Sequence, residues 1–235
     1  MTVEVEVDVE LLKSEIKKTY ASVSEDPGKD FIFPTGRPWA EDLDYPDELG
    51  KVPDSSAEAF AGVANPFSLG RLDSGERVLD LGSGAGTDSL VAAQMVGGSG
   101  HVTGIDMTPE MLARARASAA EMGAANVEFV EGEAERLPFP DESFDVVISN
   151  GVIDLVPDKD AVFAEIFRVL APGGRIQLAD VTIQNRHGFE QIETGQLVDT
   201  YAHSKFEDTR RKAQKFGARG TTIKAFKPKI AARSS

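Results

Sequence analysis

The chain has 235 residues, and its hydrophobic content of 41% is ordinary for a globular protein with one large domain. Its 39 acids against 25 bases give a formal net charge of −14, which disfavours nucleic acid and anionic membranes as partners. The absence of cysteine excludes disulfides, thiolate metal sites and cysteine nucleophiles, and without a signal-like or 18-residue apolar stretch we expect a cytoplasmic protein with no metal site.

The first 70 residues have no sustained pattern, and we expect them to form an N-terminal cap and loop region on a main domain of residues 71–235. Residues 3–10 alternate apolar and acidic side chains, as a strand does, whereas residues 11–20 have helical spacing. The stretch 24–56 is rich in proline and glycine, so turns should dominate it. Its aromatic residues indicate that it packs onto the main domain: Phe31, Phe33, Trp39 and Tyr45.

From residue 77 onward, short apolar strands alternate with helices. We expect strands at 77–82, 101–106, 126–132, 144–150 and 174–181, and helices at 87–97, 107–123 and 158–170. Repeated units of this length predict a doubly wound, mostly parallel α/β sheet. After residue 181 only about seven residues precede the next strand-like stretch, fewer than the dozen that a parallel crossover usually needs, so we expect a shortened crossover after the fifth strand.

The first of these strands runs into a turn, VLDLGSGAGTD, in which an acid precedes three alternate glycines. Glycines let the backbone turn tightly and let a ligand approach it, and the following helix N-terminus favours an anionic group. The dinucleotide fingerprint G-x-G-x-x-G/A fails here, because Thr87 stands five residues after Gly82. Asp80 would repel a pyrophosphate but suits an ammonium group such as that of S-adenosylmethionine. Asp106, at the end of the second strand, could accept hydrogen bonds from ribose hydroxyls.

Four segments resemble, in order and spacing, the motifs of the class I S-adenosylmethionine-dependent methyltransferases: VLDLGSGAGTD, GHVTGIDMTPEML, VEFVEGEAERLPFPDESFDVVISN and IFRVLAPGGRIQLADV. The resemblance implies a Rossmann-like fold with a seven-stranded type of sheet, closed by ARGTTIKAFKP. It also implies the cofactor contacts: Gly82, Ser83, Gly84 and Gly86 would wrap the methionine part near Asp80, Asp106 would hold the ribose, Met107 would lie against adenine, Glu133 and Ala134 would reach the adenine edge, and Asn150 and Gly151 would line the site below the sulfonium.

Within this family the nearest subgroup resembles the arsenite methyltransferases, through SNGVIDLVPDK and GVANP. That subgroup carries cysteines in both segments, where this chain has Val63 and Gly151. Trivalent arsenic is soft and is held by thiolates, so arsenite is disfavoured as the methyl acceptor. LPFPDESFDVV is also similar to the quinone-biosynthesis C-methyltransferases, which would suggest an apolar or phenolic acceptor.

The leading hypothesis is therefore an S-adenosylmethionine-dependent methyltransferase that acts on a small molecule. The alternative is a cofactor-binding protein of the same fold with weak or lost transfer, and a nicotinamide oxidoreductase is disfavoured by Thr87 and Asp80. The acceptor and the oligomeric state stay open.

No catalytic residue is assigned from the sequence. The sulfonium is already an activated leaving group, so aligning donor and acceptor can supply much of the rate and a base is optional. His101, His187 and His203 give no catalytic signal. Asp154, just after the fourth strand, is an acid/base candidate by location, and Tyr20 could bring its ring over the cofactor if the N-terminal helix caps the site.

Overall fold

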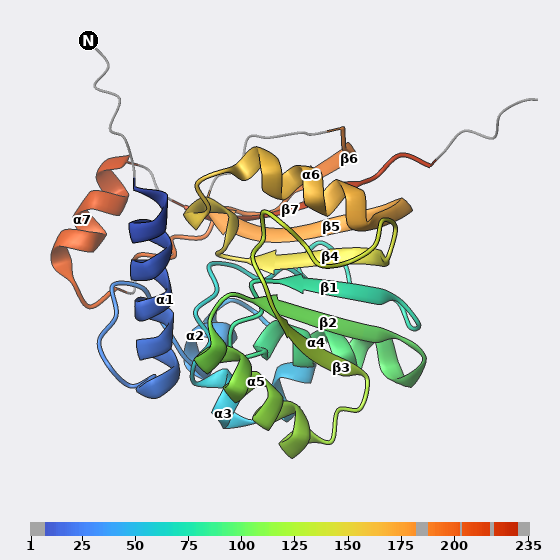
Figure 1. Cartoon of the computed structure of the whole chain (residues 1–235). Coiled ribbons are helices and arrows are strands. Elements are labelled where there is room, and N and C mark those ends of the chain that lie inside the picture. Colours follow the sequence, from blue (N-terminus) through green and yellow to red (C-terminus); the bar gives the residue numbers. More distant parts are fainter. Residues whose placement is uncertain (1–7, 182–187, 203, 217–218, 230–235) are drawn as a thin grey trace, which may run out of the picture.

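A seven-stranded sheet organises the chain in the computed structural model, which describes residues 8–181, 188–202, 204–216 and 219–229 (Figure 1). The strand order is β3-β2-β1-β4-β5-β7-β6. The first five strands are mutually parallel, and β7 is antiparallel to both of its neighbours. The strands are β1 (Arg77–Leu81), β2 (His101–Asp106), β3 (Val127–Glu131), β4 (Phe144–Asn150), β5 (Leu170–Val181), β6 (Glu190–Thr194) and β7 (Gly220–Phe226). The doubly wound, mostly parallel α/β class is thus confirmed.

Three helices connect the parallel strands where the sequence predicts them: α4 (Thr87–Val96), α5 (Pro109–Met122) and α6 (Lys159–Val169). The carboxylate of Asp158 starts α6 by accepting a hydrogen bond from the Ala161 amide at 2.9 Å. At the start of α5 the side chain of Thr108 makes no capping bond, and its amide instead donates to Asp106 Oδ1 at 2.8 Å. This bond fixes the end of β2 relative to α5.

The two faces of the sheet bury separate cores. Leu79, Leu81 and Val147 face α6, whereas Val78 and Val146 face α4 and α5. This alternation along β1 and β4 follows from the two-residue period of a strand. Each face of the central strands therefore packs against helices, as the nearly continuous apolar strands predict.

Nearly every residue of α4 is buried, because residues 37–57 cover its outer side. That segment forms the short helices α2 (Arg37–Asp42) and α3 (Asp54–Ala57) and the 3₁₀ helix η1 (Asp47–Lys51). The expectation that turns dominate this stretch is wrong at these helices, since Pro38 falls in the first turn of α2 and is compatible with a helix start. The expected packing is confirmed: Trp39 is 5% exposed, and its Nε1 donates to the Gly62 carbonyl at 2.7 Å.

An N-terminal helix, α1 (Val9–Glu25), stands beside the carboxyl ends of the strands (Figure 1). It begins at Asp8, whose side chain accepts a hydrogen bond from the Leu11 amide at 3.0 Å. The helical spacing of residues 11–20 is confirmed, but Val9 and Glu10 are helical, so the strand expected over residues 3–10 is wrong there. Residues 3–7 of that expectation lie outside the described residues.

The connection from β5 to β6 is short, as expected. Val181 ends β5 and Glu190 begins β6, and of the residues between them the structure describes Gly188 and Phe189. The Phe189 ring packs edge-on against Phe167 of α6, with 5.4 Å between the ring centroids. The basic stretch before the last strand forms α7 (Glu207–Phe216), and β7 is the expected closing strand. None of the helices in the described residues has the length and apolar character that crossing a membrane requires.

Candidate cofactor site

A cavity of about 1050 Å³, counted with its mouth, opens at the carboxyl ends of β1, β2 and β4. The chain leaves β1 toward β2 and β3 and returns on the other side of β1 as β4, so strand order reverses at this point. Open α/β sheets bind ligands at such a switch point. The cavity is walled by the turn between β1 and α4, by the residues that follow β2 and β4, and by α1.

The glycine turn presents backbone to the cavity. The Gly82 and Ser83 amides donate to the Ile105 carbonyl at 2.8 and 2.9 Å, which ties the turn to β2. A Cβ added to Gly84 would meet nothing within 4 Å, whereas one on Gly82 would lie 2.2 Å from Val152 Cγ2. Ser83 Oγ is buried and has no hydrogen-bond partner among the described residues. The turn therefore offers an open backbone position and an unused hydroxyl to a ligand.

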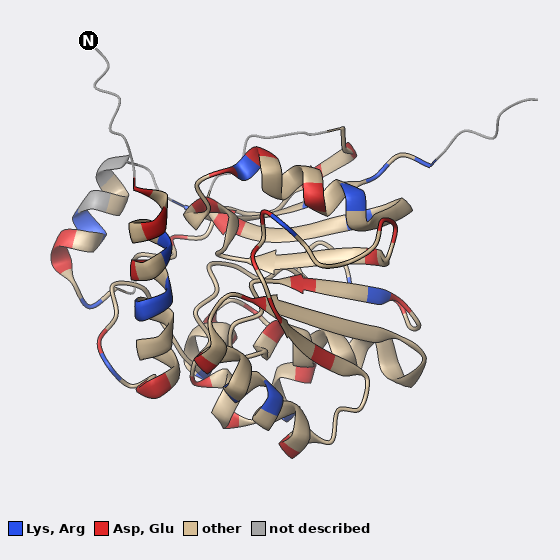
Figure 2. Cartoon of the chain, viewed as in Figure 1, with Lys and Arg blue, Asp and Glu red and all other residues tan. Residues whose placement is uncertain are grey.

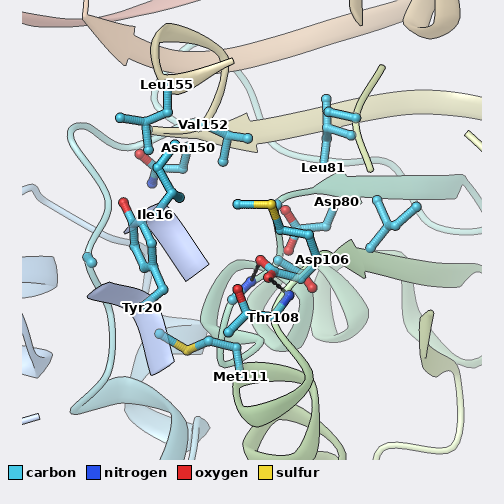
Figure 3. A pocket seen from close by; sticks show the side chains of 18 of the residues that line it. Ile16, Tyr20, Asp80, Leu81, Asp106, Thr108, Met111, Asn150, Val152 and Leu155 are labelled. Carbon is cyan, nitrogen blue, oxygen red and sulfur yellow. Dashed lines mark hydrogen bonds between the residues drawn. The ribbon is translucent and has the colours of Figure 1, made fainter. Parts of the chain in front are cut away.

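Asp106 joins the end of β2 to this turn (Figure 3). Its Oδ2 accepts a hydrogen bond from the Gly84 amide at 2.9 Å, and its Oδ1 accepts the bond from Thr108 described above. Burial raises the pKa of Asp106, and these amide donors oppose the rise. The Thr108 side chain and the Met107 amide also act on this carboxyl group and lower its pKa, and Asp106 lines the cavity.

Two more carboxyl groups line the cavity without a cation. Asp80 is 1% exposed and accepts a hydrogen bond from Ser89 Oγ at 2.5 Å, and Asp88 is 7% exposed. Among the described residues neither forms a salt bridge. Burial, and then the neighbouring Asp88, raise the pKa of Asp80 well above its ordinary value, and burial raises that of Asp88 to about 6. Because buried anions without a counter-ion are costly, this part of the cavity favours a positively charged ligand group.

Asn150, at the end of β4, is held by the N-terminal loop. Its Oδ1 accepts a hydrogen bond from the Val63 amide at 2.8 Å, and its Nδ2 donates to the Ala64 carbonyl at 2.9 Å. A Cβ added to the next residue, Gly151, would lie 3.1 Å from Val63 Cγ1. The two positions at which the arsenite subgroup carries cysteines are thus neighbours in space, and both are apolar here.

Helix α1 covers the cavity from the side opposite to the strands. Tyr20 and Ile16 lie across the opening from Asp80 and Asp106 (Figure 3). Burial is the main cause of the raised pKa of Tyr20, and Tyr20 stacks on Phe33 with 5.9 Å between ring centroids. The expectation that this tyrosine reaches the site is therefore supported by its position.

Lys13 of α1 closes the mouth. Its Nζ lies 2.7 Å from Glu133 Oε2 and 3.1 Å from Glu135 Oε1. Figure 2 shows the basic positions of α1 and the acidic positions at the ends of β1 and β2. The hydrogen bond to Lys13 lowers the pKa of Glu133, so this carboxylate stays ionised at the edge of the cavity.

All but one of the residues expected at the cofactor line the cavity: Asp80, Gly82, Ser83, Gly84, Asp106, Met107, Glu133, Ala134, Asn150 and Gly151. Gly86 is the exception. A Cβ there would lie 2.9 Å from Phe129 Cζ and 3.0 Å from Ala115 Cβ, so Gly86 serves the packing of the turn on β3 and α5.

Sequence reasoning missed Asp88, Tyr45 and Lys13. Asp88 has the pattern of an ordinary acid in the first turn of a helix, and the other two reach the site from distant parts of the chain. His101 lies at the amino end of β2, whereas the cavity lies at the carboxyl ends of the strands. His187 and His203 lie outside the described residues.

Asp154 lies on the 3₁₀ helix η3 (Ile153–Leu155), beside Asp180 at the end of β5. The Asp180 Oδ2 atom accepts a hydrogen bond from the Ile153 amide at 2.8 Å. Burial, with Asp154 as the next cause, raises the pKa of Asp180 to about 7. The two carboxyl groups thus form a pair next to the cavity wall at Gly151 and Val152.

The fold and the cavity define an α/β domain of the nucleotide-cofactor class, with a site that favours a cationic ligand. The methyltransferase domain family model matches residues 72–219. An arsenite methyltransferase of Halobacterium salinarum is 51% identical over 135 residues, which make up 57% of this chain and 34% of that protein. A demethylmenaquinone methyltransferase of Listeria monocytogenes is 40% identical over 126 residues, 54% of this chain and 53% of that protein.

Among solved structures, an arsenic(III) S-adenosylmethionine methyltransferase from Chlamydomonas reinhardtii superposes with a TM-score of 0.64 and 31% identity, covering 85% of this chain and 75% of that one. The chain therefore belongs to the methyltransferase domain family, and its class is the S-adenosylmethionine-dependent methyltransferases. It spans about a third to a half of the length of the curated relatives it matches, 34% and 53%.

Proposed function

We propose that this protein transfers the methyl group of S-adenosylmethionine to a small-molecule acceptor. The single observation that supports the cofactor most strongly is the pair of buried carboxyl groups, Asp80 and Asp88, that face the cavity beside an open glycine backbone without a cation. When bound, the cofactor supplies a methyl group on a positively charged sulfur. Its ammonium group would meet the charge requirement of this wall.

The proposed contacts follow the cavity lining. The methionine part would lie along the turn, with Gly84 giving room for close approach and Ser83 Oγ available for a hydrogen bond. Asp106, which lines the cavity at the end of β2, would hold the ribose. Met107, Glu133 and Ala134 would surround the adenine, with α1 closing over it through Lys13. We propose that residues 1–70 act as the cap of the domain of residues 71–235.

The acceptor end of the site would lie between α1 and the residues after β4. The side chains there are largely apolar, with Ile16, Val152 and Leu155 in the cavity wall. Because the chain contains no cysteine and Val63 faces Gly151, we propose an organic acceptor and not thiolate-bound arsenite. The similarity to demethylmenaquinone methyltransferases supports an apolar or phenolic compound.

A proton leaves the acceptor if its nucleophilic atom carries one. We propose that the Asp154–Asp180 pair accepts this proton. Asp180 has a pKa of about 7, and the pair adjoins the cavity wall. Rate would come mainly from holding donor and acceptor in line.

The test has two stages. Calorimetry should show binding of S-adenosylmethionine and no binding of NAD, since Thr87 and Asp80 do not suit a pyrophosphate. Release of S-adenosylhomocysteine is then measured with catechol, 1,4-naphthohydroquinone and arsenite as acceptors. Binding without turnover of any organic acceptor would favour a cofactor-binding protein with lost transfer, and absence of binding would refute the proposal.

A further inference from the structure

Tyr45 reaches the cavity wall from the loop after α2, although it does not line the cavity itself. Its hydroxyl donates a hydrogen bond to Asp88 Oδ1 at 2.7 Å and accepts one from Asn150 Nδ2 at 2.8 Å. Asn150 Nδ2 also lies 3.1 Å from Asp88 Oδ2. The two oxygens of Asp88 thus each face a neutral donor, one from the N-terminal segment and one from β4.

The ring of Tyr45 has a separate task from its hydroxyl. It packs edge-on against Phe60 and Phe67, with centroid separations of 5.1 and 6.0 Å. A phenylalanine at position 45 would keep these ring contacts and lose the bonds to Asp88 and Asn150. The two contributions can therefore be separated by one oxygen atom.

The donors matter because of what else faces Asp88. The neighbouring acid is Asp80 from β1, and the charges of Asp88 and then of Asp106 add to burial in raising the pKa of Asp80. In the described residues, the groups that oppose the protonation of Asp88 are Tyr45 and Asn150, and no lysine or arginine forms a salt bridge with it. Burial raises the pKa of Asp88 to about 6 against the effect of these two donors. Without them the carboxyl group would hold its proton at a still higher pH.

We propose that Tyr45 is a positioning residue for the cofactor: its hydroxyl, together with the Asn150 amide, orients the Asp88 carboxylate toward the cavity as a second anion for the amino-acid end of the ligand. This inference rests on the proposed function, because it assigns the ammonium group of S-adenosylmethionine to the Asp80–Asp88 wall. It also gives the N-terminal segment a direct part in cofactor binding, through a residue that the ligand does not touch.

The test measures the dissociation constant of S-adenosylhomocysteine by calorimetry between pH 5.5 and 8.5, for the wild type and Tyr45→Phe. Loss of one hydrogen bond to a charged group should raise the Asp88 pKa by about one unit. Affinity should then fall about fivefold at pH 6 and stay nearly unchanged at pH 8.5, because Asp88 is ionised in both proteins there. A purely structural role of the hydroxyl would lower affinity by the same factor at every pH.

Two controls isolate the effect. Tyr201→Phe makes the same chemical change at a half-buried tyrosine that does not line the cavity and whose electrostatic neighbours are Asp154 and Asp180, not Asp88, so it should not reproduce the fivefold loss of affinity at pH 6. 5′-Methylthioadenosine has no amino-acid tail, so its affinity should not respond to Tyr45→Phe at any pH. Asp88→Asn, which removes the titrating group, should bind S-adenosylhomocysteine more weakly than the wild type at pH 8.5 and flatten the profile above pH 6.

The outcomes separate this inference from the proposed function. A wild type that binds S-adenosylhomocysteine while Tyr45→Phe loses affinity equally at pH 6 and pH 8.5 would overturn the positioning role alone. An unchanged profile in both Tyr45→Phe and Asp88→Asn would do the same. Failure of the wild type to bind either S-adenosyl compound would overturn the proposed function, and the inference with it.

Discussion

Gly84→Val tests the placement of the cofactor most directly. The added Cβ would meet no protein atom within 4 Å, so the side chain would project into the cavity. The backbone of Gly84 has φ of +51°, where an L-residue costs about 1–2 kcal/mol. For a domain of this size we expect the melting temperature to fall by about 2–8 °C. The fold should therefore survive, and the Gly84 amide can still donate to Asp106.

Cofactor affinity should respond far more strongly than stability. A valine places three carbon atoms in the space where the ligand would approach the turn, so we expect at least about a hundredfold rise in the dissociation constant of S-adenosylmethionine, equivalent to about 2.7 kcal/mol. Gly84→Ala should give a smaller loss. Calorimetry measures the affinity, and circular dichroism measures the melting temperature.

Gly86→Ala is the matched control, because its added carbon would contact protein. The clash with Phe129 and Ala115, together with a φ of +88°, should cost more stability than Gly84→Val does. The protein that remains folded should keep most of its affinity for the cofactor. Wild-type affinity in Gly84→Val would refute the reasoning, since the ligand would then bind away from this turn.

Three other predictions concern charge and acceptor chemistry. Folding raises the pKa of Asp180 from its ordinary value to about 7, so ionisation of this group opposes folding and stability falls as pH rises from about 4 to about 7. Asp154→Asn should therefore raise the melting temperature at pH 8 by about 3 °C and leave it unchanged at pH 5, and the reverse order would contradict the pairing. Lys13→Ala should weaken cofactor binding about threefold in low salt, an effect that 0.5 M salt should abolish in calorimetry if the bridges to Glu133 and Glu135 are its cause. Arsenite offered with a thiol reductant should give no methylated arsenic by mass spectrometry, and turnover would show that thiolates of the protein are not needed.

The sequence predicts the parallel strands and the glycine turn well, because both depend on local pattern. Strands buried on two faces are nearly continuous in apolar residues, and alternate glycines after an acid are hard to mistake. The short helices of residues 37–57 could not be predicted from the sequence, because a proline at the first turn of a helix cannot be distinguished in sequence from a proline in a turn.

The polar contacts of the site could not be predicted from local sequence patterns. Asp88 and Tyr45 are 43 residues apart in sequence, and Lys13 and Glu133 are 120 apart. Their pairing depends on how the N-terminal segment packs across α4 and how α1 crosses the strand ends. No periodicity in the sequence records these contacts.

The burial of α4 between the sheet and residues 37–57 has a consequence for folding. Residues 37–57 are synthesised before α4 and the strands against which they pack, so their side chains cannot be buried until those later elements have formed. Pairs such as Trp39 with the sheet core close long loops, which slows folding relative to local contacts. A ligand-ready cavity should therefore be among the last features to form, and cofactor binding can serve as a late marker in refolding kinetics.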